Sequence, residues 1–273
     1  MSDIPSDAYV IIIGAMKSGT TSLYSYLAQH PGLCECRIKE PEYFSRYQSH
    51  GIEEKNYEEL WDFDDTLHRY ALDGSTGYTK YPMEKGVPER ISKYGIDPMF
   101  IYILRDPFER IESHYNSGRF NTEWNHSIVD EHLINVSNYY LQLQCFRQFF
   151  SRDRFLLLDF KRMKTDPEKV LERIYDFLHL DHSFFPDSYY RKNETEYRTR
   201  LELLYGKLIR TTRISRIIPE SLKKLGRRIC NRATPVRRRL LTEEERKTVF
   251  DALEGDMIKL RDEYGFDVGM WGF

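Results

Sequence analysis

Short apolar runs alternate with amphipathic segments along the first 180 residues of this chain. Residues 9–13, 99–104 and 155–159 are dominated by aliphatic and aromatic side chains, and residues 70–73 form a shorter run of the same kind. An apolar run without polar alternation is typical of a strand that is buried on both faces of a parallel sheet. The four segments are therefore predicted to be strands.

Segments with helical spacing fill the intervals between these runs. Leu23 and Leu27 share one face of the segment 20–29, and Pro31 followed by Gly32 ends it. Further helices are predicted at residues 87–93, 108–115, 138–150, 167–178 and 242–264. Strands that alternate with helices predict an α/β fold, in which helices flank both faces of a parallel β-sheet, with a helical C-terminal part. No repeat or linker is visible, which favours one domain over residues 1–273.

Composition narrows the class of protein without naming a function. Hydrophobic residues make up 40% of the chain and charged residues 31%, enough for a buried core. Four cysteines are too few for a disulfide scaffold, and Cys34 and Cys36 lack the spacing and partners of a zinc site. The first apolar run is too short for a signal peptide or a membrane span. We expect a cytoplasmic protein with reduced thiols and no metal.

Positive charge is concentrated in one part of the chain. Residues 207–239 hold twelve Lys or Arg and one acid, Glu220, although the whole chain has a net charge of −2. This basic helical segment, about residues 201–240, has three interpretations: amphipathic helices on an anionic membrane, a cover over a cofactor or anionic glycan, or a solvated helical hairpin. No recognition motif accompanies the charge, so we expect no nucleic-acid partner.

The first predicted strand is joined to the first helix by a small-residue loop, residues 14–22 (GAMKSGTTS). Gly14 and Gly19 have the spacing of the nucleotide motif G-x-x-x-x-G-K-[ST], but Thr20 takes the place of its lysine, and Lys17 stands in mid-loop. Backbone N–H groups and a helix N-terminus favour an anion here. The loop fits one 5'-phosphate better than a metal-bound triphosphate.

A second anion site is predicted after the strand at residues 99–104. Arg105 stands at the strand end, and Ser113 follows eight residues later, just over two helical turns on. A guanidinium and a hydroxyl that face one point suit a phosphate monoester. Two phosphate sites at two strand ends indicate a nucleoside that is phosphorylated at both ends, which ATP is not.

Both motifs resemble those of sulfotransferases that use 3'-phosphoadenosine-5'-phosphosulfate (PAPS). The resemblance implies in-line transfer of a sulfuryl group to an acceptor hydroxyl or amine, with 3'-phosphoadenosine-5'-phosphate (PAP) as product. Lys17 would hold the 5'-phosphate and the bridging oxygen, and Arg105 with Ser113 the 3'-phosphate. The remaining contacts would come from Ser18, Gly19, Thr20, Thr21 and Ser22.

A general base is suggested by residues 39–44 (KEPEYF). An acceptor hydroxyl must lose its proton during transfer, and a nearby carboxylate could take it. The segment resembles the Glu-x-x-[Phe/Tyr]-Phe stretch of heparan-sulfate sulfotransferases, which implies that Glu40 is the base and that the acceptor is a carbohydrate or glycolipid. Glu42 is a rival, and an ordinary exposed acidic loop is the other interpretation. The Lys-Thr-His motif of cytosolic aryl sulfotransferases is absent.

Residues 73–78 depart from the glycan-enzyme pattern Glu-Lys-[Ser/Thr]-Pro-x-Tyr, because Gly74 stands where the lysine would be. This segment therefore gives no support for a second catalytic lysine. Two other functions stay open. A P-loop kinase or NTPase is disfavoured by the missing lysine after Gly19. A non-catalytic module that binds membranes or polyanions through residues 207–239 is the other alternative.

Overall fold

A central sheet of five parallel strands organises the computed structural model of the chain. The structure describes residues 4–46, 56–118, 126–186, 189 and 238–273. The strands are β1 (Tyr9–Gly14), β2 (Leu33–Glu35), β3 (Tyr70–Asp73), β4 (Met99–Leu104) and β5 (Phe155–Asp159), in the order β2-β3-β1-β4-β5. The four predicted strands are confirmed, and β2 is an additional strand of three residues.

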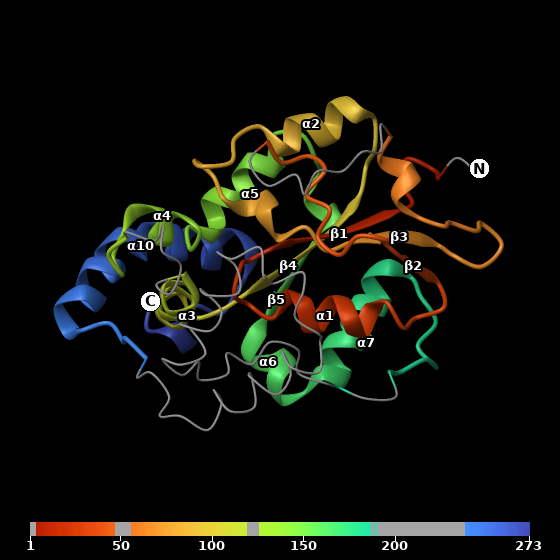
Figure 1. The fold of residues 1–273 in the computed structure, drawn as a ribbon. Helices are drawn as coiled ribbons and strands as arrows, with labels where there is room; N and C mark the ends of the chain where they lie inside the picture. Colours follow the sequence, from red (N-terminus) through yellow and green to blue (C-terminus); the bar gives the residue numbers. More distant parts are fainter. Residues whose placement is uncertain (1–3, 47–55, 119–125, 187–188, 190–237) are drawn as a thin grey trace, which may run out of the picture.

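Helices cover both faces of this sheet (Figure 1). They are α1 (Thr20–Leu27), α2 (Val87–Tyr94), α3 (Pro107–Gly118), α4 (Glu131–Asn135), α5 (Tyr139–Arg147), α6 (Phe160–Thr165), α7 (Pro167–Leu178) and α10 (Glu243–Tyr264). The predicted helices are confirmed with small shifts at their ends, whereas α4 and α6 were not predicted. The predicted α/β class, with a parallel sheet between helical layers and a helical C-terminal part, is thus confirmed.

Two hydrophobic clusters form because successive side chains of a strand point to opposite faces. In β1, Val10 and Ile12 belong to the cluster that contains Leu23 of α1 and Ile174 of α7. Tyr9, Ile11 and Ile13 belong to the other cluster, which contains apolar residues of α2, α5 and α10. Every residue of β1 is buried. This two-sided burial explains why the strand has an uninterrupted apolar sequence.

The loops that follow β1 and β4 lie side by side at one edge of the sheet. After β1 the chain builds β2 and β3 on one side, and it then crosses to place β4 and β5 on the other. Ligands of such sheets bind at the carboxyl ends of the strands where this reversal occurs. The backbone N–H of Ala15 donates to the carbonyl of Ile103 at 2.8 Å, which joins the two strand ends.

The C-terminal helix α10 is docked on α5 through the half-buried carboxylate of Asp256. Asp256 accepts hydrogen bonds from the backbone N–H groups of Tyr140 and Leu141, each at 2.9 Å, and so caps the start of α5. Burial raises the pKa of Asp256 to about 6. Thr242 and Glu245 form a capping box at the start of α10. Within the described ranges, no helix is long and apolar enough to cross a membrane.

Candidate active site

Two glycines allow the predicted phosphate loop its shape. Gly14 has a φ of 146°, and a Cβ on it would lie 2.2 Å from the hydroxyl of Thr79. Gly19 has a φ of 83°, and its Cβ would lie 2.5 Å from the ring of Phe160. Positive φ together with this crowding requires glycine at both positions. The local sequence therefore fixes the sharp turn that leads from β1 into α1.

Between these glycines the loop carries the groups expected of an anion site. Lys17 is half-buried and has a φ of 71°. Non-glycine residues rarely adopt this left-handed conformation, and those that do often lie at functional sites. Ser18 is fully buried, and its hydroxyl has no hydrogen-bond partner among the described residues. The N-terminus of α1 has neither a capping side chain nor an acidic residue in its first turn. These groups fit a bound phosphate, which would accept from the Ser18 hydroxyl and from the first backbone N–H groups of α1.

The other predicted loop residues lie in the first turn of α1. Thr20 and Ser22 are buried, and Thr21 is half-buried. The hydroxyl of Thr21 accepts a hydrogen bond from Nζ of Lys39 at 3.1 Å. The phosphate loop is therefore in direct contact with the segment that contains the predicted base.

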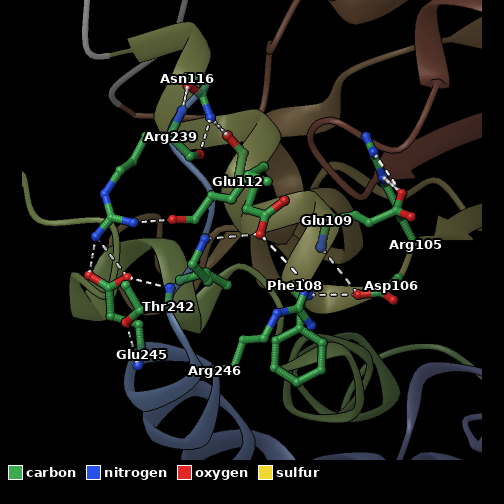
Figure 2. Close-up of polar contacts among 12 residues, drawn as sticks. Arg105, Asp106, Phe108, Glu109, Glu112, Asn116, Arg239, Thr242, Glu245 and Arg246 are labelled. Carbon is green, nitrogen blue, oxygen red and sulfur yellow. Dashed lines mark hydrogen bonds and ion pairs between the residues drawn. The ribbon is translucent and has the colours of Figure 1, made fainter. Parts of the chain in front are cut away.

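Arg105 joins the second predicted anion site to the first. Its NH1 group donates to the carbonyl of Lys17 at 3.1 Å, and its guanidinium lies over the ring of Phe160, 4.9 Å from the centroid. Nε and NH2 pair with Glu109 on α3 (Figure 2). The hydroxyl of Tyr139 donates to the carbonyl of Arg105 at 2.6 Å and fixes its backbone. A phosphate at this site would compete with Glu109 for the guanidinium.

Ser113 lies half-buried on α3, the same helix that begins after Arg105. None of the hydrogen bonds between described residues joins Ser113 to Arg105. Its predicted contact with a 3'-phosphate stays a prediction.

Helix α3 is clamped by the chain that leads into α10 (Figure 2). The side chain of Asn116 accepts from the N–H of Arg239 at 2.9 Å and donates to its carbonyl at 2.8 Å. Glu112 accepts from the N–H of Leu241 at 3.1 Å. Arg239 itself is paired with Glu245 at 2.6 Å. Arg239, the last residue of the predicted basic segment, thus serves an internal contact, while residues 207–237 lie outside the described part of the chain.

The two candidate bases lie in different surroundings. Glu40 has a φ of 58°, and its side chain is 29% exposed and paired with Lys39 at 3.0 Å. Because Lys39 also contacts Thr21, the Glu40 carboxylate lies beside the phosphate loop. This is the position that a base for an acceptor hydroxyl would need.

Glu42, by contrast, is buried and makes structural hydrogen bonds. Its Oε1 accepts from the N–H of Gly77 at 2.7 Å, and its own N–H donates to the hydroxyl of Ser75 at 2.8 Å. Burial raises the pKa of Glu42 to about 8, and the charge of Lys80 and the hydrogen bond from Gly77 oppose this rise. Glu42 therefore ties the base loop to the turn after β3.

Two further charged or titratable groups lie near this site and belong to none of the motifs predicted from the sequence. Lys80 is 4% exposed, and its charge interacts with those of Glu40 and Glu42. Burial lowers the pKa of His114, and the charge of Arg110 lowers it further. His132, Lys17 and Lys80 have smaller effects in the same direction. Arg110 donates to Nδ1 of His114 at 3.3 Å, so this nitrogen cannot act as a base. Neither residue belongs to a short sequence motif. What distinguishes both residues is their burial, which becomes visible only in the folded structure.

Position 74 has no room for a lysine side chain in this fold. This explains why residues 73–78 depart from the glycan-enzyme pattern. A Cβ on Gly74 would lie 2.8 Å from Cδ2 of Tyr24, a buried ring whose hydroxyl accepts from the N–H of Cys36 at 3.0 Å. Overpacking of this kind costs about 1–3 kcal/mol. Gly74→Ala should lower the free energy of unfolding by that amount, and Gly74→Lys by more, in urea denaturation.

The matched control for this prediction is Gly255 in α10, where nothing lies within 4 Å of an added Cβ. Gly255→Ala should raise the free energy of unfolding by about 1 kcal/mol, because alanine is the better helix former. If Gly74→Ala were as stable as the unchanged protein, Tyr24 could move aside, and the loop would tolerate a side chain at this position.

Metal and disulfide chemistry find no support in the part of the chain that the structure describes. No group of three or more His, Cys, Asp or Glu is placed there to hold a metal ion. Cys34, Cys36 and Cys145 are free thiols.

Comparisons with known proteins agree with the geometry. A family model described as "Sulfotransferase domain" matches residues 7–201. Heparan sulfate glucosamine 3-O-sulfotransferase 3A1 of Mus musculus is 26% identical over 210 residues, which cover 68% of this chain and 49% of that protein. Membrane-associated sulfotransferase kil1 of Dictyostelium discoideum is 33% identical over 116 residues, 42% of this chain and 23% of that protein. This chain thus spans about half the length of the first of these relatives.

A solved structure shares the fold. The crystal structure of a sulfotransferase from Alicyclobacillus acidocaldarius superposes with a TM-score of 0.67 at 20% identity, covering 97% of this chain and 98% of that one.

Proposed function

Because this chain belongs to the sulfotransferase domain family, we propose that it transfers the sulfuryl group of PAPS to a hydroxyl or amine of an acceptor. The observation that carries the proposal is the contact between the two predicted anion sites. Arg105 donates to the backbone carbonyl of Lys17, so the residues that follow two strand ends are in direct contact at the carboxyl end of the sheet. A nucleoside with phosphates at both ends needs such a pair of sites.

The residues of the phosphate loop would hold the donor. The sulfotransferase family uses PAPS, which supplies an activated sulfuryl group on its 5'-phosphate. Lys17 would bind the 5'-phosphate and stabilise the charge that develops there as the sulfuryl group leaves. The free hydroxyl of Ser18 and the first turn of α1 would donate to the same group. Arg105, with Ser113, would hold the 3'-phosphate.

Glu40 would take the proton from the acceptor. Its carboxylate is accessible and lies beside the phosphate loop through Lys39, whereas Glu42 is buried and bound to Gly77. A base must reach the acceptor oxygen while that oxygen approaches the sulfur in line with the leaving group. Of the two carboxylates, Glu40 fits this requirement.

We propose a carbohydrate or glycolipid hydroxyl as the acceptor. The support is the likeness of residues 39–44 to the glycan enzymes, together with relatives that are named heparan sulfate glucosamine 3-O-sulfotransferases. A cytoplasmic location and a peripheral membrane contact through residues 207–239 remain predictions of the sequence.

PAP should stabilise the protein against heat without any metal. A ligand that binds only the folded state at about 100 times its Kd adds about 2.7 kcal/mol, which for a chain of this size raises Tm by roughly 5 °C or more. A thermal-shift titration with PAP, and with ATP in the presence and absence of magnesium, measures this.

Adenosine 5'-phosphate is the matched control, because it lacks the 3'-phosphate and should give a smaller shift. Stabilisation by magnesium–ATP alone would instead support the P-loop kinase interpretation and overturn the proposed donor.

A further inference from the structure

A nearly buried lysine stands at the wall of the candidate active site. Lys80 follows the 3-10 turn η2 (Thr76–Thr79) and is 4% exposed, and no other lysine of the described ranges is as buried. Lysine is almost never buried unless other charges compensate it. Burial lowers the pKa of Lys80, and nearby carboxylates act in the opposite direction. Its burial therefore calls for a reason.

The backbone beside Lys80 is held by a buried amide. Oε1 of Gln142 accepts from the N–H of Tyr81 at 3.0 Å, and Nε2 donates to the carbonyl of Tyr81 at 2.8 Å. Nε2 also donates to the carbonyl of Asn135 at the end of α4, at 3.0 Å. Gln142 is 1% exposed, so these bonds are shielded from water. The clamp fixes the chain at Lys80 relative to α4 and α5.

Three carboxylates act on the charge of Lys80. They are Glu42, Glu40 and Glu84, in decreasing order of their effect on its pKa. Glu84 is already compensated, because it pairs with Arg90 at 2.7 Å and accepts from the hydroxyl of Ser45 at 2.7 Å. Glu40 pairs with the exposed Lys39.

Glu42 has no such second cation among the described residues. One carboxylate oxygen of Glu42 accepts a hydrogen bond from Gly77. The other is buried and has no hydrogen-bond partner among the described residues. Asp73 and Glu40 both oppose its ionisation. Lys80 is therefore the cation on which the ionised form of Glu42 depends.

The charge of Lys80 also acts on two histidines. It helps to lower the pKa of His114 on α3 and of His132 on α4, in both cases after the larger effect of burial. The charge of Lys17 in the phosphate loop also acts on His114. Lys80 thus lies within electrostatic range of both the base loop and these histidines.

We propose that Lys80 is a positioning residue, whose buried ammonium is the counter-ion of the loop that carries Glu40 and Glu42. Glu42 anchors this loop to η2 through Gly77 and Ser75, and Lys80 leaves η2 at its other end. The ammonium favours the ionised form of Glu42, whose bond to Gly77 holds the loop that carries Glu40. This inference rests on the proposed role of Glu40.

The first test is independent of turnover. Glutamate side-chain carboxyl carbons are labelled with carbon-13, and their NMR signals are followed against pH, with Glu40→Gln and Glu42→Gln assigning the two signals. In Lys80→Met the titration midpoint of Glu42 should rise by about one pH unit or more, because an opposite charge has been removed. Lys85→Met, an exposed neighbour in the sequence, should leave it unchanged. An unchanged midpoint in Lys80→Met would overturn the inference.

Rescue and clamp variants guard against a folding defect in Lys80→Met. Lys80→Arg keeps the charge and should keep the midpoint of Glu42 near that of the unchanged protein. Gln142→Leu keeps the lysine but frees Tyr81, and it should move the midpoint in the same direction as Lys80→Met by a smaller amount. If Lys80→Arg titrated like Lys80→Met, the charge would not be the cause and the inference would fail.

Turnover supplies the second test, on any acceptor that the unchanged protein sulfates. Lys80→Met should lower kcat severalfold at pH 7, because the loop that carries Glu40 is held less well, and Lys80→Arg should restore it, with Kd for PAPS within twofold in both variants. An equal loss of PAPS affinity would place Lys80 in the donor site and overturn the inference. If no acceptor is sulfated, the proposed function fails by itself, and the NMR titration still decides the role of Lys80.

Discussion

Lys17→Ala is expected to abolish measurable sulfuryl transfer and to weaken PAP binding at least tenfold. Lys17 is held in a left-handed conformation between two required glycines, so the direction in which its side chain leaves the backbone is fixed. A hydrogen bond to a charged group contributes about 1.5–3 kcal/mol, which corresponds to roughly 10- to 100-fold in affinity. Loss of charge stabilisation on the leaving group lowers kcat by a further factor of about 10²–10³.

Arg105→Ala should weaken PAP binding to a similar degree, because it removes both the guanidinium and the contact with the carbonyl of Lys17. Arg105→Lys keeps the charge but loses the planar fork, and its affinity should fall between those of Arg105→Ala and the unchanged protein. Calorimetric titration with PAP measures all of these affinities. Lys93→Ala is the control, since that lysine is 74% exposed and pairs with Glu89 in the same helix. Full PAP affinity in Lys17→Ala would show that the loop binds no phosphate.

Lys17→Ala and Arg105→Ala should both weaken PAP binding because the two residues follow strands that are neighbours where the sheet order reverses. The phosphate loop follows β1 and Arg105 follows β4, and the two strands are neighbours in the sheet although Gly14 and Met99 are 85 positions apart in the chain. Parallel neighbours present their carboxyl ends at the same edge. The fold thereby brings two short, local sequence motifs together.

The strands were predictable because burial on both faces leaves a strong local signal. The runs at residues 70–73, 99–104 and 155–159 match β3, β4 and β5 at both ends. β2 was missed because its three residues, Leu33–Glu35, are too few to show a pattern. α4 was missed for a similar reason, with five residues and one fully buried side chain, Leu133. Such short elements are set by tertiary contacts rather than by periodicity.

The candidate donor site leaves a clearer signal in the sequence than the candidate acceptor side. The loop at residues 14–22 carries its candidate groups in consecutive residues, so the sequence can propose Lys17 and its neighbours as donor-binding residues. The choice between Glu40 and Glu42 could not be made from sequence, since both lie in one acidic stretch. It depends on the bond from Gly77 to Glu42, a contact across 35 positions of the chain. The role of Lys80 could not be predicted from the sequence either, because its burial results from tertiary packing.

Glu40→Gln is expected to lower kcat by about 10²–10⁴-fold while PAP binding stays within twofold of that of the unchanged protein. An amide has nearly the shape of the carboxylate but cannot accept the acceptor proton, and general-base catalysis contributes about this factor. Because Glu40 is partly exposed and pairs with the exposed Lys39, the change should leave the free energy of unfolding nearly unaltered. Single-turnover transfer from labelled PAPS, followed beside PAP titration, separates chemistry from binding.

Glu42→Gln is the matched control for this experiment. Its amide oxygen can still accept from the N–H of Gly77, and the residue is 2% exposed, so it should retain turnover within about tenfold, far above the level of Glu40→Gln. The reverse order of the two variants would make Glu42 the base. It would also require the base loop to open and expose Glu42 when the acceptor binds, because in this structure its carboxylate lies beneath the loop, bound to Gly77 and beside Lys80.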